Sequence, residues 1–166
     1  LTAYRIWNNY ALLLTANPNN DDLGIAQGTF GTDAPTIQSD DAGGTTVTQK
    51  LGLQLVLPTE YDDGKDIQLR IRGGMITTVS DGTATVDVSA YLHDNDGSVG
   101  SDLCTTAAQS INSLTKANRD FVITPTGVVT GDALDIVVTL AITDSGNAGV
   151  MLGEISRIAM LLDIKG

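Results

Sequence analysis

The chain has 166 residues and carries 20 acidic and nine basic side chains, which gives a formal net charge of −11 at pH 7. This charge argues against a nucleic-acid contact surface, because such a surface needs lysine and arginine to replace the counterions of the phosphates. No apolar run approaches the about 20 residues that a membrane-spanning helix needs, and the single cysteine, Cys104, excludes an internal disulfide. We therefore expect a single domain that binds neither nucleic acid nor membrane.

The choice of acidic residue indicates the fold class. Eighteen acids are aspartate and only two, Glu60 and Glu154, are glutamate. Aspartate favours turns and caps, whereas glutamate favours helix interiors. The 18 glycines and the many threonines and valines favour strands and turns as well. We expect an all-β protein with little helix.

The first 50 residues are less regular than the rest. Residues 4–15 fit either a first strand or an extended N-terminal arm, and Trp7 with the leucines at 12–14 makes them more apolar than an exposed terminus needs. Residues 16–50 lack a clear period, which is uncommon for so long a segment in a compact domain. Either a short strand near residues 25–30 interrupts this segment, or it crosses onto a neighbouring subunit. We favour the arm, and we divide the single domain into residues 1–50, the arm and irregular loop, and residues 51–166, the body.

From residue 51 onward, apolar and polar residues alternate with period two, as in strands with one dry face. The alternating segments are residues 51–57, 67–72, 83–92, 134–142 and 158–164, with a short apolar run at 121–124.

Turn residues separate these segments, and Gly73-Gly74 is expected to break or bulge the strand that precedes it. With the N-terminal segments, we count about eight strands. We predict an antiparallel two-sheet β-sandwich of the jelly-roll type, with about eight strands and an extended N-terminal arm.

A loop at residues 93–98 contains clustered aspartate and asparagine, whose oxygens are ligands that calcium prefers. Asp94 and Asp96 are the metal-site candidates. The loop does not fit an EF-hand, because Leu92 stands where the first ligand would be, and Asn-Asp-Gly is common in hairpin turns. We expect a turn that holds no metal.

Catalytic chemistry is not indicated by any motif. The only histidine, His93, has no nucleophile motif to complete a triad, and Cys104 has no activating partner in the sequence. We expect Cys104 to be a buried or half-buried small side chain. We predict that the protein is not an enzyme and uses no cofactor.

Two groups of residues are candidates for contacts in the body. Arg70 and Arg72 form a basic stripe, and arginine pairs well with acids across an interface; the alternative is pairing with the protein's own aspartates. Tyr91 lies on the polar side of its strand and is expected to be exposed or at an interface. Jelly rolls also bind sugars on exposed sheet faces, although only seven aromatic residues, one of them tryptophan, are available here.

Several stretches of the second half resemble small virion proteins of tailed phages. The similarity covers residues 50–166 and lies in turn and strand segments, with no active-site motif. These stretches are residues 57–64 (LPTEYDDG), 72–81 (RGGMITTVSD), 84–88 (ATVDV), 99–112 (VGSDLCTTAAQSIN), 131–136 (GDALDI) and 161–166 (LLDIKG).

The resemblance implies a structural virion protein, made in the host cytoplasm. At this size and fold it is similar to jelly-roll decoration, or cement, proteins on the outer surface of the phage head. The partner would be the major capsid protein. A homotrimer would gain avidity from three simultaneous contacts, and the acidic charge suits a position away from packaged DNA.

The alternative that we keep is a carbohydrate- or receptor-binding β-sandwich domain of a phage tail or fibre. For contacts with the shell or between subunits, the N-terminal segment is the first candidate and the body residues are the second. The predicted contact residues are Tyr4, Trp7, Tyr10, Leu12, Leu14, Arg70, Arg72 and Tyr91.

Overall fold

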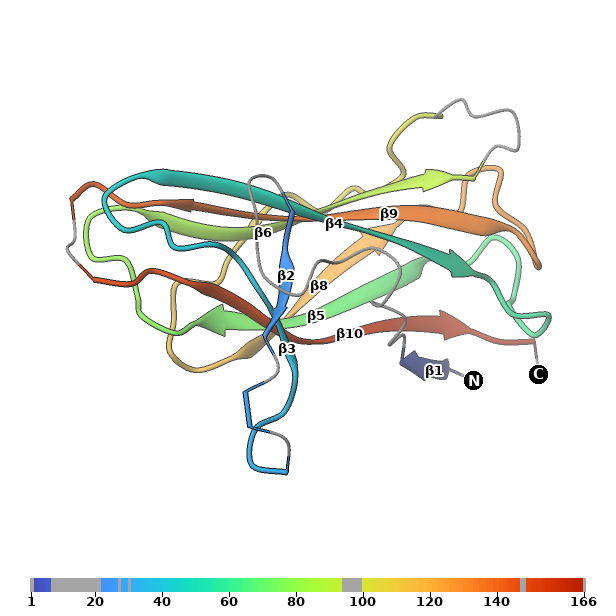
Figure 1. Cartoon of the computed structure of the whole chain (residues 1–166). Coiled ribbons are helices and arrows are strands. Elements are labelled where there is room, and N and C mark those ends of the chain that lie inside the picture. Colours follow the sequence, from blue (N-terminus) through green and yellow to red (C-terminus); the bar gives the residue numbers. More distant parts are fainter. Residues whose placement is uncertain are drawn as a thin grey trace.

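The computed structural model describes residues 2–6, 22–26, 28–29, 31–93, 100–146 and 149–165, with only the backbone described for residues 2–6. Its strands form two antiparallel sheets that pack face to face (Figure 1). No described segment is a helix that could cross a membrane. The strands are β1 (Thr2–Ile6), β2 (Gly24–Ala26), β3 (Thr36–Gln38), β4 (Thr46–Val56), β5 (Ile67–Met75), β6 (Thr83–Leu92), β7 (Gln109–Ser110), β8 (Ala117–Ile123), β9 (Ala133–Thr143) and β10 (Gly153–Asp163).

The predicted all-β sandwich of two antiparallel sheets is confirmed. The described residues form ten strands, compared with the about eight that the sequence indicated. The difference arises from β3 and β7, which have three and two residues, while β2 coincides with the short strand considered near residues 25–30. Segments of that length are too short to show a period-two pattern.

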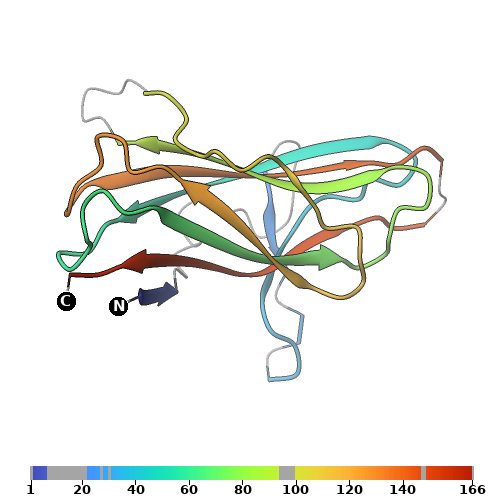
Figure 2. The same cartoon turned by 180° about the vertical axis from the view of Figure 1, so that it is seen from behind.

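Sheet A has the strand order β2-β3-β10-β5-β8, and β1 also pairs with β10. β10 pairs with β5 from Gly153 to Leu161, while β3 and β1 pair with opposite ends of β10. β8 forms the far edge of the sheet beside β5 (Figure 2). Since Thr2 pairs with Asp163, the two ends of the chain lie near each other.

Sheet B has the strand order β4-β9-β6-β7. β4 and β9 pair from Thr46 to Val56 without a register shift, and β6 pairs with β9 on the other side from Thr83 to Leu92. This continuous register determines which side chains are neighbours across the sheet. The outward residues of β4, β9 and β6 therefore lie in straight rows across the sheet.

The core lies between the sheets and consists of alternate residues from each strand. Tyr61 and Phe121 are its largest fully buried side chains, and the Tyr61 hydroxyl donates a hydrogen bond to the Lys65 carbonyl. Each buried leucine or isoleucine contributes roughly 1.5–3 kcal/mol, so these residues together decide which face of each strand turns inward. Examples are Leu51, Leu53 and Leu55 of β4, Ile67, Leu69 and Ile71 of β5, and Leu134, Ile136 and Val138 of β9.

Residues 22–26 connect the two sheets at one edge of the sandwich. Asp22 forms a bridge with Lys50 of β4, and Leu23, which is fully buried, donates its backbone N–H to the Lys50 carbonyl (3.0 Å). β2 then pairs with β3 in sheet A, so this segment spans from one sheet to the other (Figure 1). The irregular first third of the sequence thus contributes strands to the sandwich, and β4, starting at Thr46, runs across the boundary expected at residue 50.

The N-terminal segment begins as a strand. Thr2–Ile6 form β1, whose backbone pairs with β10, in agreement with the first-strand interpretation for these five residues. Residues 7–15, the rest of that segment, lie outside the described residues, as do residues 16–21 of the irregular loop.

The expectation that Gly73-Gly74 breaks or bulges its strand is wrong. β5 continues through both glycines to Met75, and the register shift lies on the partner strand β10, between Ile155 and Arg157. A Cβ on Gly74 would lie 2.9 Å from the carbonyl oxygen of Ser113. Close approach of another backbone, and not a turn, therefore requires a glycine at position 74.

Replacing Gly82 with alanine is expected to destabilise the fold, because a Cβ there would lie 1.9 Å from the carbonyl oxygen of Thr143. The hairpin end would have to shift, and overpacking of this kind lowers the free energy of unfolding by about 1–3 kcal/mol. Urea unfolding followed by circular dichroism measures the loss. The matched control is Gly52→Ala, where nothing lies within 4 Å of the Cβ position and stability should be retained or raised by about 0.5–1 kcal/mol. Equal stability of the two variants would contradict the contact at Thr143.

Candidate functional site

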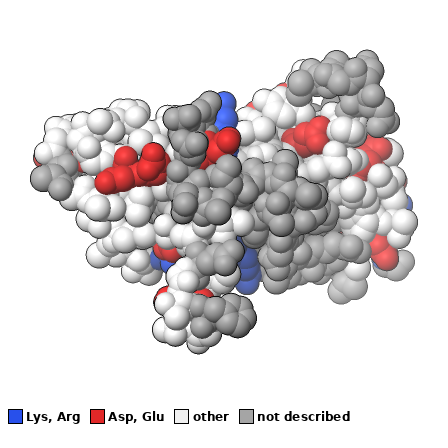
Figure 3. Space-filling model, in the orientation of Figure 1, with Lys and Arg blue, Asp and Glu red and all other residues white. Residues whose placement is uncertain are grey.

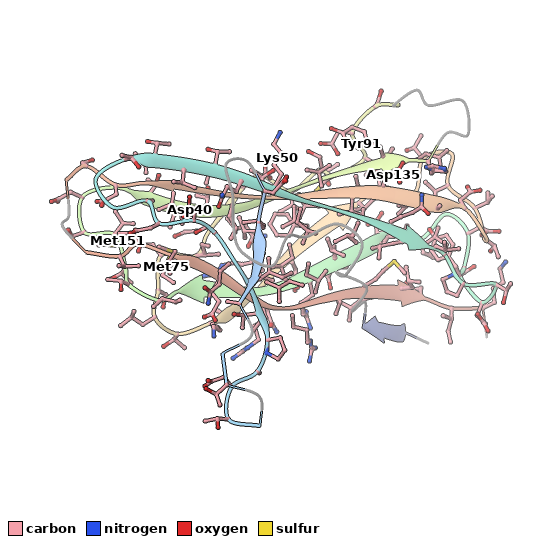
Figure 4. The ribbon with its side chains drawn as sticks, viewed as in Figure 1. Asp40, Lys50, Met75, Tyr91, Asp135 and Met151 are labelled. Atoms are coloured by element: carbon pink, nitrogen blue, oxygen red, sulfur yellow. The ribbon has the colours of Figure 1, made fainter. Side chains whose placement is uncertain are left out.

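The outward side of sheet B forms an exposed polar surface, which we call face B. The alternation that buries Leu51 and Leu53 turns their neighbours to the opposite side of the strand. Figure 4 shows Lys50, Tyr91 and Asp135 on this sheet. The outward residues are half-buried or exposed: Thr48, Lys50, Gly52, Gln54 and Val56 on β4, Ala133, Asp135, Val137, Thr139 and Ala141 on β9, and Thr85, Asp87, Ser89 and Tyr91 on β6.

Four polar side chains meet at one end of face B, and we call them the Gln54 cluster: Gln54, Tyr91, His93 and Asp135. Gln54 Nε2 donates to Asp135 Oδ1 (3.1 Å), and His93 Nδ1 lies 2.8 Å from Asp135 Oδ2. Gln54 Nε2 also lies 3.3 Å from His93 Nδ1. The three hydrogen-bonded side chains therefore hold one another in place on the surface of the sheet.

The sheet register brings this cluster together. Gln54 on β4 lies opposite Asp135 on β9, which lies opposite Tyr91 on β6. His93 follows β6 directly, and its backbone N–H bonds to the Ala133 carbonyl (2.9 Å), which fixes it at the end of the sheet. Neighbouring strands are about 4.8 Å apart, so the four side chains occupy one compact area.

Beside the Gln54 cluster, the next row of face B is low. It consists of Gly52, Val137 and Ser89, and it lies about 7 Å along the strands from the cluster. The row after it is polar and consists of Lys50, Thr139 and Asp87. Gly52 and Ser89 have small side chains, so this row is low on β4 and β6, on either side of Val137.

The electrostatics of the cluster depend on Asp135. Partial burial alone would raise the pKa of this carboxyl, but hydrogen bonds from His93 and Gln54 hold the pKa below its usual value. Asp135 is therefore a charged acceptor at neutral pH. Together with the amide of Gln54 and the phenol of Tyr91, it offers both donors and acceptors to a ligand.

Several residues predicted as site candidates lie outside the part of the chain that is described. For Tyr4, only the backbone is described, and it pairs with Leu161 of β10. Within the described residues, no group of three or more histidine, cysteine, aspartate or glutamate side chains could hold a metal ion. The candidates that fall outside are Trp7, Tyr10, Leu12, Leu14, Asp94 and Asp96.

Arg70 and Arg72 lie on the outer surface of sheet A, on the opposite sheet from Tyr91. Arg70 forms a two-pronged ion pair with Asp120 of β8, with Nε–Oδ1 and Nη2–Oδ2 distances of 2.6 and 2.7 Å. The hydrogen bond to Asp120 raises the pKa of the guanidinium. Arg70 thus pairs with an acid of its own chain, which was the alternative interpretation, while Arg72 is exposed. These three predicted contact residues do not form one surface.

Sequence reasoning identified Tyr91 but missed Gln54 and Asp135 as parts of a site. Both occupy polar positions in alternating segments, so the sequence predicts that their side chains point outward. It does not predict that the two side chains are neighbours, because Gln54 and Asp135 are 81 positions apart and meet only through the β4-β9 register.

Comparisons with known proteins find similarity in fold. No family model matches the sequence, and no curated protein matches it. Solved structures with a similar fold include a candidate sugar-binding protein from Bacteroides thetaiotaomicron VPI-5482, with a TM-score of 0.55, 10% identity, and coverage of 97% of this chain and 88% of that chain.

Two further solved structures are carbohydrate-binding modules. The xylan-binding module CBM15 has a TM-score of 0.51 and 14% identity, covering 100% of this chain and 99% of that chain. The module TmCBM61, in complex with β-1,4-galactotriose, has a TM-score of 0.50 and 11% identity, covering 96% and 88%. At these identities the similarity shows a shared β-sandwich fold.

Cys104 is half-buried, as the sequence predicted, and burial raises the pKa of its thiol, with nearby Asp102 and Asp87 adding to the rise. A raised pKa leaves less thiolate at neutral pH, and only the thiolate is nucleophilic. Alkylation by iodoacetamide at about pH 7 should therefore be slower than that of glutathione, and it should accelerate as the pH rises above 9. Mass spectrometry of the full chain over time measures both rates. A rate at neutral pH equal to that of glutathione would contradict this environment.

Proposed function

We propose that this chain is a non-catalytic carbohydrate-binding β-sandwich domain that holds a glycan on face B. The Gln54 cluster is the observation that carries the proposal, since it presents fixed donors and acceptors on an exposed sheet. A sugar hydroxyl is both a donor and an acceptor, so it needs partners of both kinds. The fold similarity to two carbohydrate-binding modules supports the same class of protein.

The shape of face B suits an extended sugar chain. Tyr91 provides an aromatic ring beside the polar side chains, and carbohydrate sites combine apolar contact with a few placed polar groups. Gly52 and Ser89 keep the neighbouring row low, so a chain could continue along the sheet from the Gln54 cluster. The glycan would lie on the surface and not in a deep cavity.

The charge of the protein favours a neutral glycan. The chain carries a net charge of −11, and the described surface in Figure 3 shows more acidic than basic groups. Asp135 adds a negative charge at the cluster itself. Repulsion would disfavour polysaccharides rich in uronic acid or sulfate.

The acids of face B are badly placed for glycoside hydrolysis. That reaction uses two carboxyl groups about 5–9.5 Å apart. Asp87 on β6 lies opposite Thr139 of β9, and Thr139 is four residues along β9 from Asp135. Asp87 and Asp135 are therefore about 13 Å apart along the strand direction. This separation supports binding without catalysis on face B.

Gln54→Ala and Tyr91→Ala are each expected to weaken glycan binding by about tenfold, which corresponds to the loss of one hydrogen bond or one ring contact. A glycan array identifies the ligand, with neutral xylan and β-1,4-galactan oligosaccharides among the probes, and titration calorimetry measures affinity. Thr48→Ala is the matched control, because it lies on the same face six residues from Gln54.

Thermal unfolding should show that all three variants are folded. Failure of the wild-type chain to bind any glycan, or equal affinity of Gln54→Ala, Tyr91→Ala and Thr48→Ala, would overturn this proposal.

A second candidate function is capsid decoration on a tailed-phage head. It is favoured by the stretches within residues 50–166 that resemble virion proteins, and by the acidic charge, which suits an outer surface. In this proposal the partner is the major capsid protein. The two candidates meet in a glycan-binding domain of a phage tail or fibre, which combines a virion location with face B as the binding surface.

A decoration protein of this kind is expected to be a homotrimer, because three weak contacts bound together gain avidity of about 10²–10⁴. Size-exclusion chromatography with light scattering, at micromolar concentration, should then give three times the 17.3 kDa chain mass. A single species at the mass of one chain would count against decoration. It would leave glycan binding on face B unaffected, since that proposal needs no second subunit.

A further inference from the structure

A pocket of about 420 Å³ opens on the outer surface of sheet A, on the opposite sheet from face B. This volume lies within the range of small-molecule sites, about 300–1,000 Å³. Neither the predicted contact residues nor the Gln54 cluster contributes to it. The polar side chains that line it are Asp33, Thr36, Gln38, Lys116, Glu154 and Ser156.

The floor of the pocket is an ion pair between Lys116 and Glu154, with an Nζ–Oε2 distance of 2.6 Å. Gly74 makes this pair possible, since it lies opposite Glu154 in the sheet and its Cβ would be 3.2 Å from the Lys116 Cα. The missing side chain lets residues 113–116 lie against β5. Gln38 Nε2 lies 3.3 Å from Thr36 Oγ1 and 3.5 Å from Glu154 Oε1, which connects β3 to the same network.

One wall of the pocket is the loop between β2 and β3, which projects from the sandwich in Figure 1. Thr29 donates its backbone N–H to Asp33 Oδ2 (2.8 Å), and the backbone N–H of Asp33 donates to the Thr29 carbonyl (2.9 Å). Gly28 has a φ of +57°, and a Cβ there would lie 2.5 Å from the Asp33 Cβ. The loop is therefore closed on itself, and it holds the Asp33 carboxylate at the pocket.

The Lys116–Glu154 pair is largely withdrawn from water, with side-chain exposures of 31% and 12%. Burial alone would raise the pKa of Glu154, but hydrogen bonds from Lys116, Thr36 and Gln38 hold the pKa below its usual value. An apolar pair of similar volume often gives at least as much stability as a buried ion pair. Charged groups of this kind within a pocket are typical of binding sites.

The lining defines the chemistry of a ligand. The charges of Lys116 and Glu154 cancel, and the carboxylate of Asp33 then gives the pocket a net charge of about −1. This charge disfavours phosphates and uronates as ligands. Lys116 has further N–H groups that need acceptors, whereas an organic ammonium ligand supplies only donors. The Gln38 side-chain carbonyl and the second Asp33 oxygen can accept hydrogen bonds from a ligand. A neutral ligand with several hydroxyl groups satisfies both requirements.

We propose that this pocket is a second, independent binding site for a neutral polyhydroxyl ligand the size of one or two sugar residues. Gln38 and Asp33 accept hydrogen bonds from its hydroxyl groups, and Lys116 donates to them. The site is separate from face B, because Glu154 and Gln38 belong to sheet A and the Gln54 cluster belongs to sheet B.

The test is a nuclear magnetic resonance titration of the ¹⁵N-labelled full chain with D-galactose, D-xylose and D-glucose, each used alone at up to about 100 mM. At least one sugar is expected to shift the backbone amides of Gln38, Lys116, Glu154 and Ser156 with a dissociation constant in the millimolar range. Gln38→Ala should weaken this binding by about tenfold. Gln54→Ala should leave it unchanged, which separates this site from face B.

D-galacturonate serves as the charged probe. It should bind at least about tenfold more weakly than D-galactose, and Asp33→Asn should reduce that difference, since asparagine keeps an oxygen for the Thr29 N–H without the charge. The proposal is overturned if no sugar shifts the four pocket amides, if only amides of face B respond, or if D-galacturonate binds more tightly than D-galactose. Retained spectral dispersion in each variant shows that the fold is intact.

Discussion

Burial of two facing rows of apolar side chains determines the position of nearly every other group in this molecule. Because side chains alternate along a strand, turning Leu51, Leu53 and Leu55 inward forces Gly52 and Gln54 outward. A shift of one residue in any long strand would exchange the two faces and expose the core. The polar groups of face B thus have fixed places, since the hydrophobic interior supplies the free energy that holds the strands in register.

The same constraint shapes the outer surface of sheet A. Ile37 and Ile155 point inward, so Gln38 and Glu154, their neighbours in register, must share the outward side. The pocket also depends on Gly74, whose missing side chain lets the backbone of residues 113–116 lie close to β5. A rigid sheet and a self-closed loop give the pocket walls that need little rearrangement on binding, which limits the entropy lost when a ligand is held.

The sequence predicted the all-β class and the long strands, because their alternation extends over six or more residues. It did not predict β3 and β7, which are too short to show a period, and it gave β2 only as one of two alternatives for residues 25–30. The prediction of a break or bulge at Gly73-Gly74 was wrong, because a pair of glycines in a sequence fits both a turn of the chain and a close approach of another backbone segment. The two sites could not be predicted, since Gln38 and Glu154 are 116 positions apart. Only the paired registers bring such residues together.

The crossing of residues 22–26 over β4 has a consequence for how copies of the protein behave in concentrated solution. Among the described strands, β4 lies at an edge and has eleven residues, and edge strands offer unpaired backbone groups to which a second chain can add. Lys50 stands at the middle of this edge, where its carbonyl already accepts the Leu23 N–H. An incoming strand would find the ladder interrupted halfway, so the crossing opposes edge-to-edge pairing between copies and the growth of fibres from it.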